Sequence, residues 1–251
     1  MRTTFRVAAG YLLVLIAVPL LVAALRAFVV DTALVHTRSM LGTLIPGDVV
    51  LINKLPYGPS TPAEIPFTSV RLPTVQLPAA VRFRPGDVVL VHRSTAGEGP
   101  RRLLKRIVGV PGDSLVIRHG LVLRNGTELP LPPGGAAGGM ETIPPFRIPL
   151  PGDTITLTPT ALSLFGNAIA ADTRDRAGEP VPLPGSRYRV RDEWFYLLGD
   201  NRGNSVDSRS WGCVTRSEVV GRSVMVFWSR DADEDGWFSG IRWDRICTIV
   251  R

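Results

Sequence analysis

The sequence contains few of the residues and motifs on which metal and nucleotide chemistry depend. Its 251 residues include only two Cys and three His. No HExxH or CxxC motif groups them, which excludes most zinc sites. Neither a GxxxxGK(S/T) loop nor a GxGxxG fingerprint is present, so nothing supports nucleotide binding. Charged residues make up 20% and apolar residues 45%, which excludes both a disordered tail and a wholly membrane-embedded protein.

Lysine is also scarce. Only two of the 29 basic residues are lysines, Lys54 and Lys105, in a chain of net charge +7. A buried Lys amine can lose its proton whereas Arg stays charged, so such a lysine hints at a site where Arg will not serve. Lys105 lies in the strand-like run LLKRIVGV, where alternation directs Lys105 and Arg106 to opposite faces. If Arg106 faces water, Lys105 faces an interior or a cleft. An ordinary salt-bridged lysine is the alternative, and we interpret Lys54, in a polar, turn-flanked setting, as structural.

The N-terminal segment predicts a transmembrane helix. Residues 7–25 carry no charge, and a helix of this length reaches roughly 28 Å, close to the hydrocarbon thickness of a bilayer. Arg2 and Arg6 favour a cytoplasmic N-terminus, although Arg26 and Arg38 weaken that preference. A cleaved secretory signal is the alternative. Both interpretations place the chain after about residue 31 outside the cytoplasm, where Cys213 and Cys247 could pair or remain free thiols.

Turn chemistry dominates the remainder of the chain. Pro-Gly-Asp occurs four times, beginning at residues 46, 85, 111 and 151, and a strand-like run follows each copy. Pro fixes φ at the first turn position, and Gly permits a positive φ at the second. With 25 Gly and 22 Pro, the sequence predicts a mostly β fold, with antiparallel sheets coiled into a small barrel-like core.

The soluble part divides into a core and an insert. After an N-terminal stub and anchor (1–30), we expect a core in two parts, 31–118 and 188–251. Residues 119–187 between them are rich in loops and contain the run LPLPPGGAAGG. No chemical cluster lies in that segment, so we interpret it as an inserted, loop-rich β subdomain.

Two further segments complete the candidate chemistry. Ser39 lies in the run TRSMLGTL, about a dozen residues after the apolar segment. Residues 199–212 read GDNRGNSVDSRSWG, a density of Asp, Asn, Ser and Arg that suits a hydrogen-bonded loop. Asp207 and Arg209 are two residues apart and can pair on one face of an extended segment. Taken singly, Ser39 suggests a surface hydroxyl and the loop a surface turn. A neutral Lys105, however, would be able to take the proton of a Ser hydroxyl.

Taken together and in this order, these segments resemble bacterial signal peptidase I, the membrane-bound Ser–Lys leader peptidase. The resemblance covers about residues 1–118 and 190–251. It implies Ser39 as the nucleophile and Lys105 as the general base, with an oxyanion hole formed by the Ser39 backbone N–H and the Thr37 hydroxyl. It further implies that Ser205 forms a hydrogen bond near the Lys amine and that Met40 lines the catalytic cleft. Asp207 and Arg209 would form an ion pair that braces their loop.

Two positions depart from the family pattern. Gly42 stands where the family usually has Pro, and Gly203 stands where it usually has Asp. Neither position carries proton chemistry, so the departures bear on the fine geometry of the site.

The resemblance also implies the biology. We expect a serine endopeptidase of the bacterial cytoplasmic membrane, single-pass, with its catalytic domain on the extracytoplasmic side. Its partners would be signal-peptide-bearing preproteins and membrane lipid, with no metal, cofactor or nucleic acid. The aromatic residues Trp228, Trp237, Phe238 and Trp243 either dip into the membrane interface or pack ordinarily. The alternatives are another Ser–Lys processing peptidase, of conjugation or organelle type, and a non-catalytic membrane-anchored β module.

Overall fold

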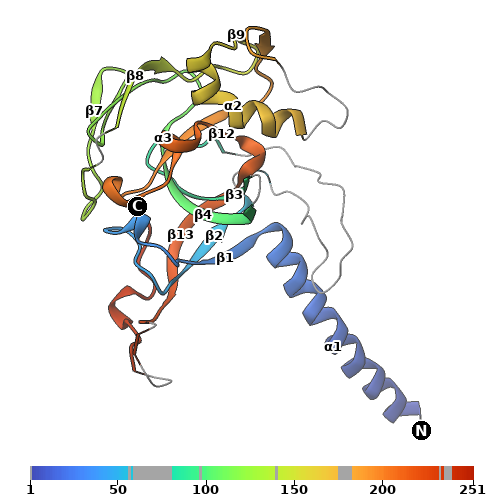
Figure 1. The fold of residues 1–251 in the computed structure, drawn as a ribbon. Helices are drawn as coiled ribbons and strands as arrows, with labels where there is room; N and C mark the ends of the chain where they lie inside the picture. The colour runs from blue at the N-terminus through green and yellow to red at the C-terminus, as the bar shows by residue number, and fades with distance from the viewer. Residues whose placement is uncertain are drawn as a thin grey trace.

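The computed structural model describes residues 2–55, 58, 81–95, 98–138, 141–174, 183–231, 233–234 and 239–251. A long N-terminal helix projects from a body built mainly of β-sheet (Figure 1). This helix, α1, runs from Arg2 to Phe28 with Pro19 inside it. No membrane-spanning helix is identified among the residues that the structure describes.

The larger sheet has seven strands, in the order β1-β2-β13-β3-β4-β11-β12. All of its pairings are antiparallel, which confirms the mostly antiparallel β class. Strands β1 and β12 lie at the two ends of this order, and closure of the sheet into a barrel stays a prediction. The strands are β1 (Val30–Leu34), β2 (Asp48–Asn53), β3 (Val88–Thr95), β4 (Glu98–Gly109), β11 (Trp194–Leu198), β12 (Val214–Thr215) and β13 (Val219–Ser229).

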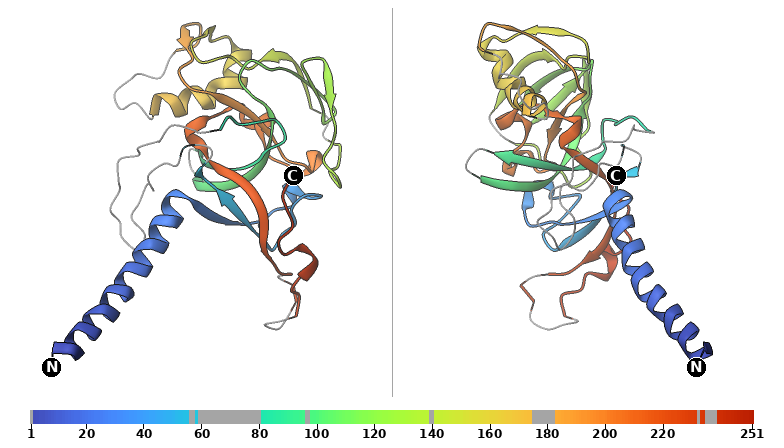
Figure 2. Two further views of the ribbon diagram at one scale, coloured as in Figure 1. Left: turned by 180° about the vertical axis from the view of Figure 1, so that it is seen from behind. Right: turned by 90° about the vertical axis from the view of Figure 1, so that its right-hand side faces the viewer.

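A second, four-stranded sheet lies at the end of the body that is farther from α1 (Figure 2). Its order is β7-β6-β5-β8, and two further strands, β9 and β10, pair with each other. The bounds are β5 (Ser114–Arg118), β6 (Leu121–Arg124), β7 (Thr127–Leu129), β8 (Thr142–Arg147), β9 (Thr154–Thr156) and β10 (Arg187–Arg189).

Helix α2 (Pro159–Arg174) is an element that our sequence analysis missed. Its apolar residues recur at helical spacing, at positions 161, 164, 165, 168 and 169, and pack into a buried cluster. The ring of Phe165 lies 5.5 Å from that of Trp194 in β11. The sequence therefore contains the 3.6-residue spacing of apolar residues that is typical of an amphipathic helix. The many Pro and Gly residues on both sides led us to expect loops and strands there instead.

The four Pro-Gly-Asp turns adopt the predicted conformation, with φ between +90° and +98° at glycines 47, 86, 112 and 152. The structure also explains the Asp. In every copy its carboxylate accepts a hydrogen bond of 2.9–3.0 Å from the backbone N–H three residues earlier. Its own N–H donates to the carbonyl of that same residue. Each turn is thus closed by two reciprocal hydrogen bonds.

Candidate active site

Ser39 is held on a short, well-anchored turn between β1 and β2. It lies in the 3-10 helix η1 (Arg38–Met40), and its side chain is buried. Met40 and Leu44, which follow it, are 1% and 0% exposed and pack in a cluster with strands β2 and β3. This packing fixes the position of the Ser39 hydroxyl relative to the sheet.

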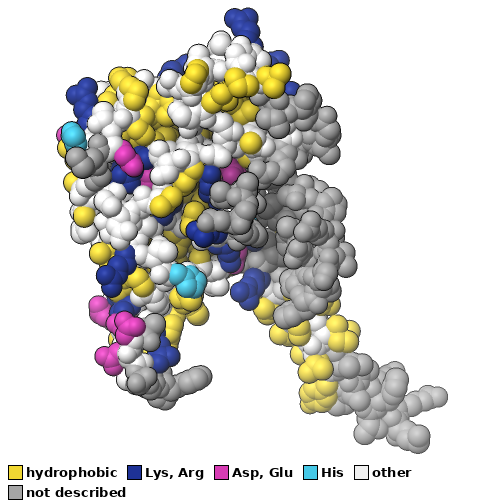
Figure 3. Space-filling model, in the orientation of Figure 1, with side chains coloured by type: hydrophobic (Ala, Val, Ile, Leu, Met, Phe, Trp, Pro, Cys, Tyr) yellow, Lys and Arg dark blue, Asp and Glu magenta, His cyan; other side chains and the backbone are white. Residues whose placement is uncertain are grey.

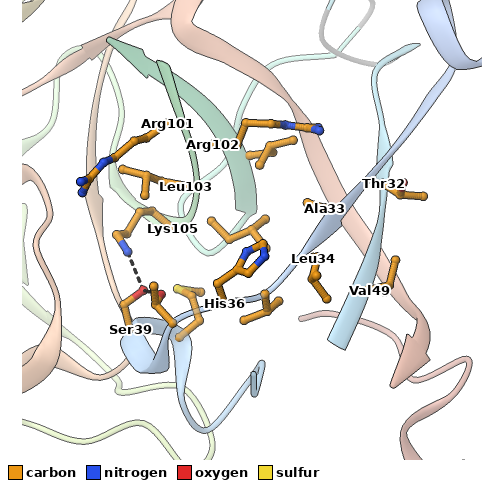
Figure 4. A pocket seen from close by; sticks show the side chains of 15 residues that line it. Thr32, Ala33, Leu34, His36, Ser39, Val49, Arg101, Arg102, Leu103 and Lys105 are labelled. Carbon is orange, nitrogen blue, oxygen red and sulfur yellow. Dashed lines mark hydrogen bonds between the residues drawn. The ribbon is translucent and has the colours of Figure 1, made fainter. Parts of the chain in front are cut away.

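Lys105 reaches Ser39 from the other side of the cleft. It lies in β4 with 2% of its surface exposed, and its Nζ donates a 2.7 Å hydrogen bond to Ser39 Oγ (Figure 4). Thr37 Oγ1 lies 3.1 Å from the same hydroxyl oxygen. The structure thus brings together three of the residues that the sequence singled out, although residues 39 and 105 are far apart in the chain.

Burial changes the acidity of Lys105. Loss of hydration lowers the pKa of its amine from the ordinary value of 10.5 to about 8, while the charges of Asp207 and Asp200 oppose this effect by favouring the ammonium. A measurable fraction of the amine is therefore neutral near pH 7. A neutral amine bonded to a hydroxyl is the arrangement that general-base activation of a serine requires.

Arg106 does not face water, contrary to the condition on which our interpretation of Lys105 partly rested. It is 7% exposed, and its Nε and Nη2 donate to the two carboxylate oxygens of Asp200, both at 2.7 Å. Thr43 Oγ1 donates to the same carboxylate at 2.6 Å. The residue after Lys105 is thus buried as well, because a fully buried Asp neutralises it. No local pattern in the sequence separates Asp200 and Thr43 from other polar loop residues.

The predicted ion pair between Asp207 and Arg209 is present and bidentate. Arg209 Nε lies 2.8 Å from Asp207 Oδ1, and Nη2 lies 2.9 Å from Oδ2. Both side chains are almost fully buried. Asp207 also accepts from the backbone N–H of Gly199, at 3.0 Å, and it caps the short helix α3 (Ser208–Trp211). The pair therefore holds both ends of the 199–209 loop together.

Ser205 does not make the hydrogen bond that the resemblance implied. Its Oγ is buried and has no hydrogen-bond partner among the described residues. A methyl group placed on Gly199 would overlap this hydroxyl and would also lie 2.5 Å from the carbonyl oxygen of Ser39. Ser205 therefore packs against the backbone next to the nucleophile, and its hydroxyl is not bonded to the amine of Lys105.

A cavity of about 570 Å³ opens beside Ser39 and Lys105, between β1 and β4 (Figure 4). An ion pair of 2.6 Å between Asp31 of β1 and Arg102 of β4 also joins these two strands. Most of the lining is apolar, and Met40 contributes to it, as predicted. The lining side chains near the dyad include Ala33, Leu34, Val35, His36, Val49, Leu90, Leu103 and Leu104.

This geometry agrees with a comparison against known families. The family model for signal peptidase, peptidase S26, matches residues 8–142 and 147–228, which is more than half of the chain. The chain belongs to the signal peptidase family, peptidase S26. This family assignment confirms the resemblance inferred from the motifs.

Individual members of the signal peptidase family are distant relatives. The chain is 24% identical to signal peptidase I of Buchnera aphidicola subsp. Baizongia pistaciae, over 90% of this chain and 78% of that protein. It is 25% identical to signal peptidase I of Bacillus caldolyticus, over 82% of this chain and 84% of that protein. A solved signal peptidase I from Enterococcus faecalis V583 is 19% identical, with a TM-score of 0.28 over 56% of this chain and 96% of that one. That likeness is too low to place any residue.

The structure also places the two cysteines and the second lysine of the sequence. Cys213 is buried and Cys247 exposed, and both are free thiols. Lys54 directly follows β2, and its Nζ donates to the carbonyl oxygen of Arg26, in the last turn of α1, at 3.5 Å. Among the described residues, no three His, Cys, Asp or Glu side chains are grouped so as to hold a metal ion.

Two of the four aromatic residues singled out near the C-terminus, Trp228 and Trp243, lie among the described residues. Trp228 and Trp243 are 38% and 67% exposed, and their rings pack edge to face. Trp237 and Phe238 lie outside the described residues.

Proposed function

We propose that this chain is a serine endopeptidase that removes signal peptides from exported preproteins through a Ser39–Lys105 dyad. The observation that carries the proposal is the 2.7 Å hydrogen bond between Lys105 Nζ and Ser39 Oγ, made by a buried amine whose pKa is lowered to about 8. Membership of the signal peptidase family supports the substrate class.

The chemistry proceeds through an acyl-enzyme. Neutral Lys105 takes the Ser39 proton as Oγ bonds to the scissile carbonyl carbon. The tetrahedral intermediate collapses, the C–N bond breaks, and the Lys105 ammonium returns the proton to the leaving amine. A water molecule then attacks the acyl carbon and loses its proton to Lys105. The bond between the acyl carbon and Ser39 Oγ breaks, and the Lys105 ammonium gives the proton to Oγ, which restores the starting enzyme. The 2.7 Å hydrogen bond between Lys105 Nζ and Ser39 Oγ supports the proton transfers between these two groups.

The oxyanion would be stabilised by the Ser39 backbone N–H and the Thr37 hydroxyl. The position of Thr37 Oγ1, 3.1 Å from Ser39 Oγ, supports this role, because the oxyanion forms on the carbonyl that Oγ attacks. The apolar cavity beside the dyad would receive the small residues that precede the cleavage site of a signal peptide. Asp207 and Arg209 would keep the neighbouring loop in place, and Ser205 would pack behind the nucleophile.

We further propose that residues 1–30 anchor the enzyme as a single transmembrane helix in the bacterial cytoplasmic membrane, with the catalytic domain outside the cytoplasm. The uncharged run at 7–25 supports this arrangement, as do the leucines at positions 13, 15, 20 and 21 of α1, which are more than 60% exposed. Figure 3 shows hydrophobic side chains at the surface of the described part of this helix. Trp228 and Trp243 would contact lipid at the interface. The catalytic core would comprise residues 31–118 and 188–251, with an insert at 119–187.

A direct assay tests the proposal. The purified full-length protein, in detergent, should cut a preprotein after its signal peptide, and sequencing of the product should identify the new N-terminus. Ser39→Ala should be folded and inactive. Cleavage by that variant would remove Ser39 from the mechanism, and a folded wild-type protein that cuts no preprotein would contradict the proposed activity.

A further inference from the structure

The loop between β7 and β8 lies against the segments that carry the nucleophile (Figures 1 and 2). We call residues 132–138 of this loop the glycine strap. It has the sequence PPGGAAG, and a turn closed by the Gly135 N–H and the Pro132 carbonyl shapes its first half. The strap belongs to the region that we expected to be a loop without chemical residues.

The first attachment of the glycine strap is to the turn after Ser39. A methyl group placed on Gly42 would overlap the carbonyl oxygen of Gly134, and one placed on Gly134 would lie 2.9 Å from Gly42 Cα. The two backbones are thus in direct contact, with no room for a side chain between them. Gly42 also has φ +104°, a conformation closed to proline. The contact explains why glycine stands at a position where the family usually has Pro.

The second attachment is to the segment beside the nucleophile. Ala136 pairs with Asn201 in a parallel bridge: its N–H donates to the Asp200 carbonyl at 3.2 Å, and its carbonyl accepts from the Arg202 N–H at 3.0 Å. On its other side, Asn201 donates from its backbone N–H to the Ser39 carbonyl at 3.0 Å and from Nδ2 to the Arg38 carbonyl at 3.1 Å. The segment 200–202 is therefore clamped between the strap and η1.

Two more contacts hold the C-terminal end of the strap. A methyl group on Gly138 would lie 3.1 Å from Gly203 Cα, so the second departure from the family pattern also lies under the strap. Just beyond the strap, Glu141 pairs with Arg209 at 3.6 Å. Arg209 is the residue that braces Asp207.

We propose that the glycine strap is a positioning element for the nucleophile, acting through Asn201, with Gly134 and Ala136 as its positioning residues. The inference rests on the proposed peptidase function. The strap touches neither Ser39 Oγ nor Lys105 Nζ in any observed hydrogen bond. It acts by fixing the segment that holds the Ser39 and Arg38 carbonyls, and hence the hydroxyl and the adjacent backbone N–H. The strap contacts both positions that depart from the family pattern, Gly42 through Gly134 and Gly203 through Gly138.

The test compares Gly134→Ala with Gly126→Ala in the full-length protein. Both glycines have a positive φ, +72° and +82°, but nothing lies within 4 Å of a methyl group on Gly126. The control therefore carries the same backbone strain without the contact. Gly134→Ala should lower kcat for a preprotein by about 10- to 100-fold with KM unchanged, because small displacements of reacting groups have effects of that size. Gly126→Ala should keep the wild-type kcat and KM.

A second variant and a second readout keep the result decisive. Ala136→Pro removes the N–H that bonds the Asp200 carbonyl, and its ring also restricts the backbone at positions 135 and 136. It should lower kcat in the same way, and it replaces Gly134→Ala as the test if that variant fails to fold. Hydrogen exchange of the Asn201 amide, which donates to Ser39, should accelerate in both variants. This readout is independent of catalysis and remains valid if the wild type cleaves nothing. Folded variants with wild-type kcat and unchanged Asn201 exchange would overturn the proposal, as would an effect confined to KM.

Discussion

Lys105 and Arg106 are neighbours in β4, both are buried, and each is bound to a different kind of partner. Lys105 donates to the neutral hydroxyl of Ser39, whereas Arg106 is neutralised by the carboxylate of Asp200. Loss of hydration lowers the pKa of the Lys105 amine to about 8. The guanidinium beside it lies in a bidentate ion pair with a fully buried carboxylate.

Replacing Lys105 by Arg should abolish preprotein cleavage. A guanidinium stays protonated at any physiological pH and cannot accept the Ser39 proton, so kcat should fall by at least about 10²-fold. Lys54→Arg is the matched control and should cleave normally, because the Lys54 amine contacts the Arg26 carbonyl in the last turn of α1 and not Ser39. Product N-terminus analysis and circular dichroism would follow both variants. Cleavage by folded Lys105→Arg at the wild-type rate would disprove the dyad.

The activity should rise with pH. Only the neutral amine is a base, and burial lowers the pKa of Lys105 to about 8. Below that value the neutral fraction, and with it kcat/KM, should increase tenfold for each pH unit. Above it kcat/KM should level off. A profile measured from pH 6 to 9.5 checks this sign, and a kcat/KM that falls between pH 6 and 8 would contradict the proposed base.

Thr37→Val removes one proposed oxyanion donor while keeping the shape of the side chain. The loss of one such donor lowers kcat by about 10²–10³-fold. Thr37→Ser restores the hydroxyl and serves as the control, which should retain most of the activity. Steady-state kinetics on a preprotein, with melting temperatures for both variants, make the comparison. An unchanged kcat in Thr37→Val would exclude its hydroxyl from the oxyanion hole.

Arg209→Gln should destabilise the fold, because it leaves Asp207 buried without its ion partner. Breaking a buried pair in this way costs about 3–5 kcal/mol. Arg147→Gln breaks the exposed, 3.6 Å pair with Asp153 and should cost less than about 1 kcal/mol. Urea unfolding of both variants measures the difference. Equal midpoints for the two would show that the 199–209 loop does not depend on the buried pair.

Local patterns carried part of the prediction. The pairing of Asp207 with Arg209 depends on residues close in the chain, and the Pro-Gly-Asp turns depend on local backbone preferences. The burial of Arg106 could not be predicted, because it depends on a distant partner, Asp200, that no local pattern indicates. The missing Ser205 hydrogen bond and the contact of the strap with Gly42 likewise depend on packing between segments far apart in the chain.

The position of β13 has a consequence for the newly made chain. Ser39 follows β1 in a unit completed by β2, and Lys105 lies in the hairpin of β3 with β4, but β2 and β3 do not pair with each other. Strand β13, from the last part of the sequence, lies between them and pairs with both. The unit of β1 and β2 that carries Ser39 and the hairpin of β3 and β4 that carries Lys105 can therefore be joined in one sheet only after residues 219–229 have been translated.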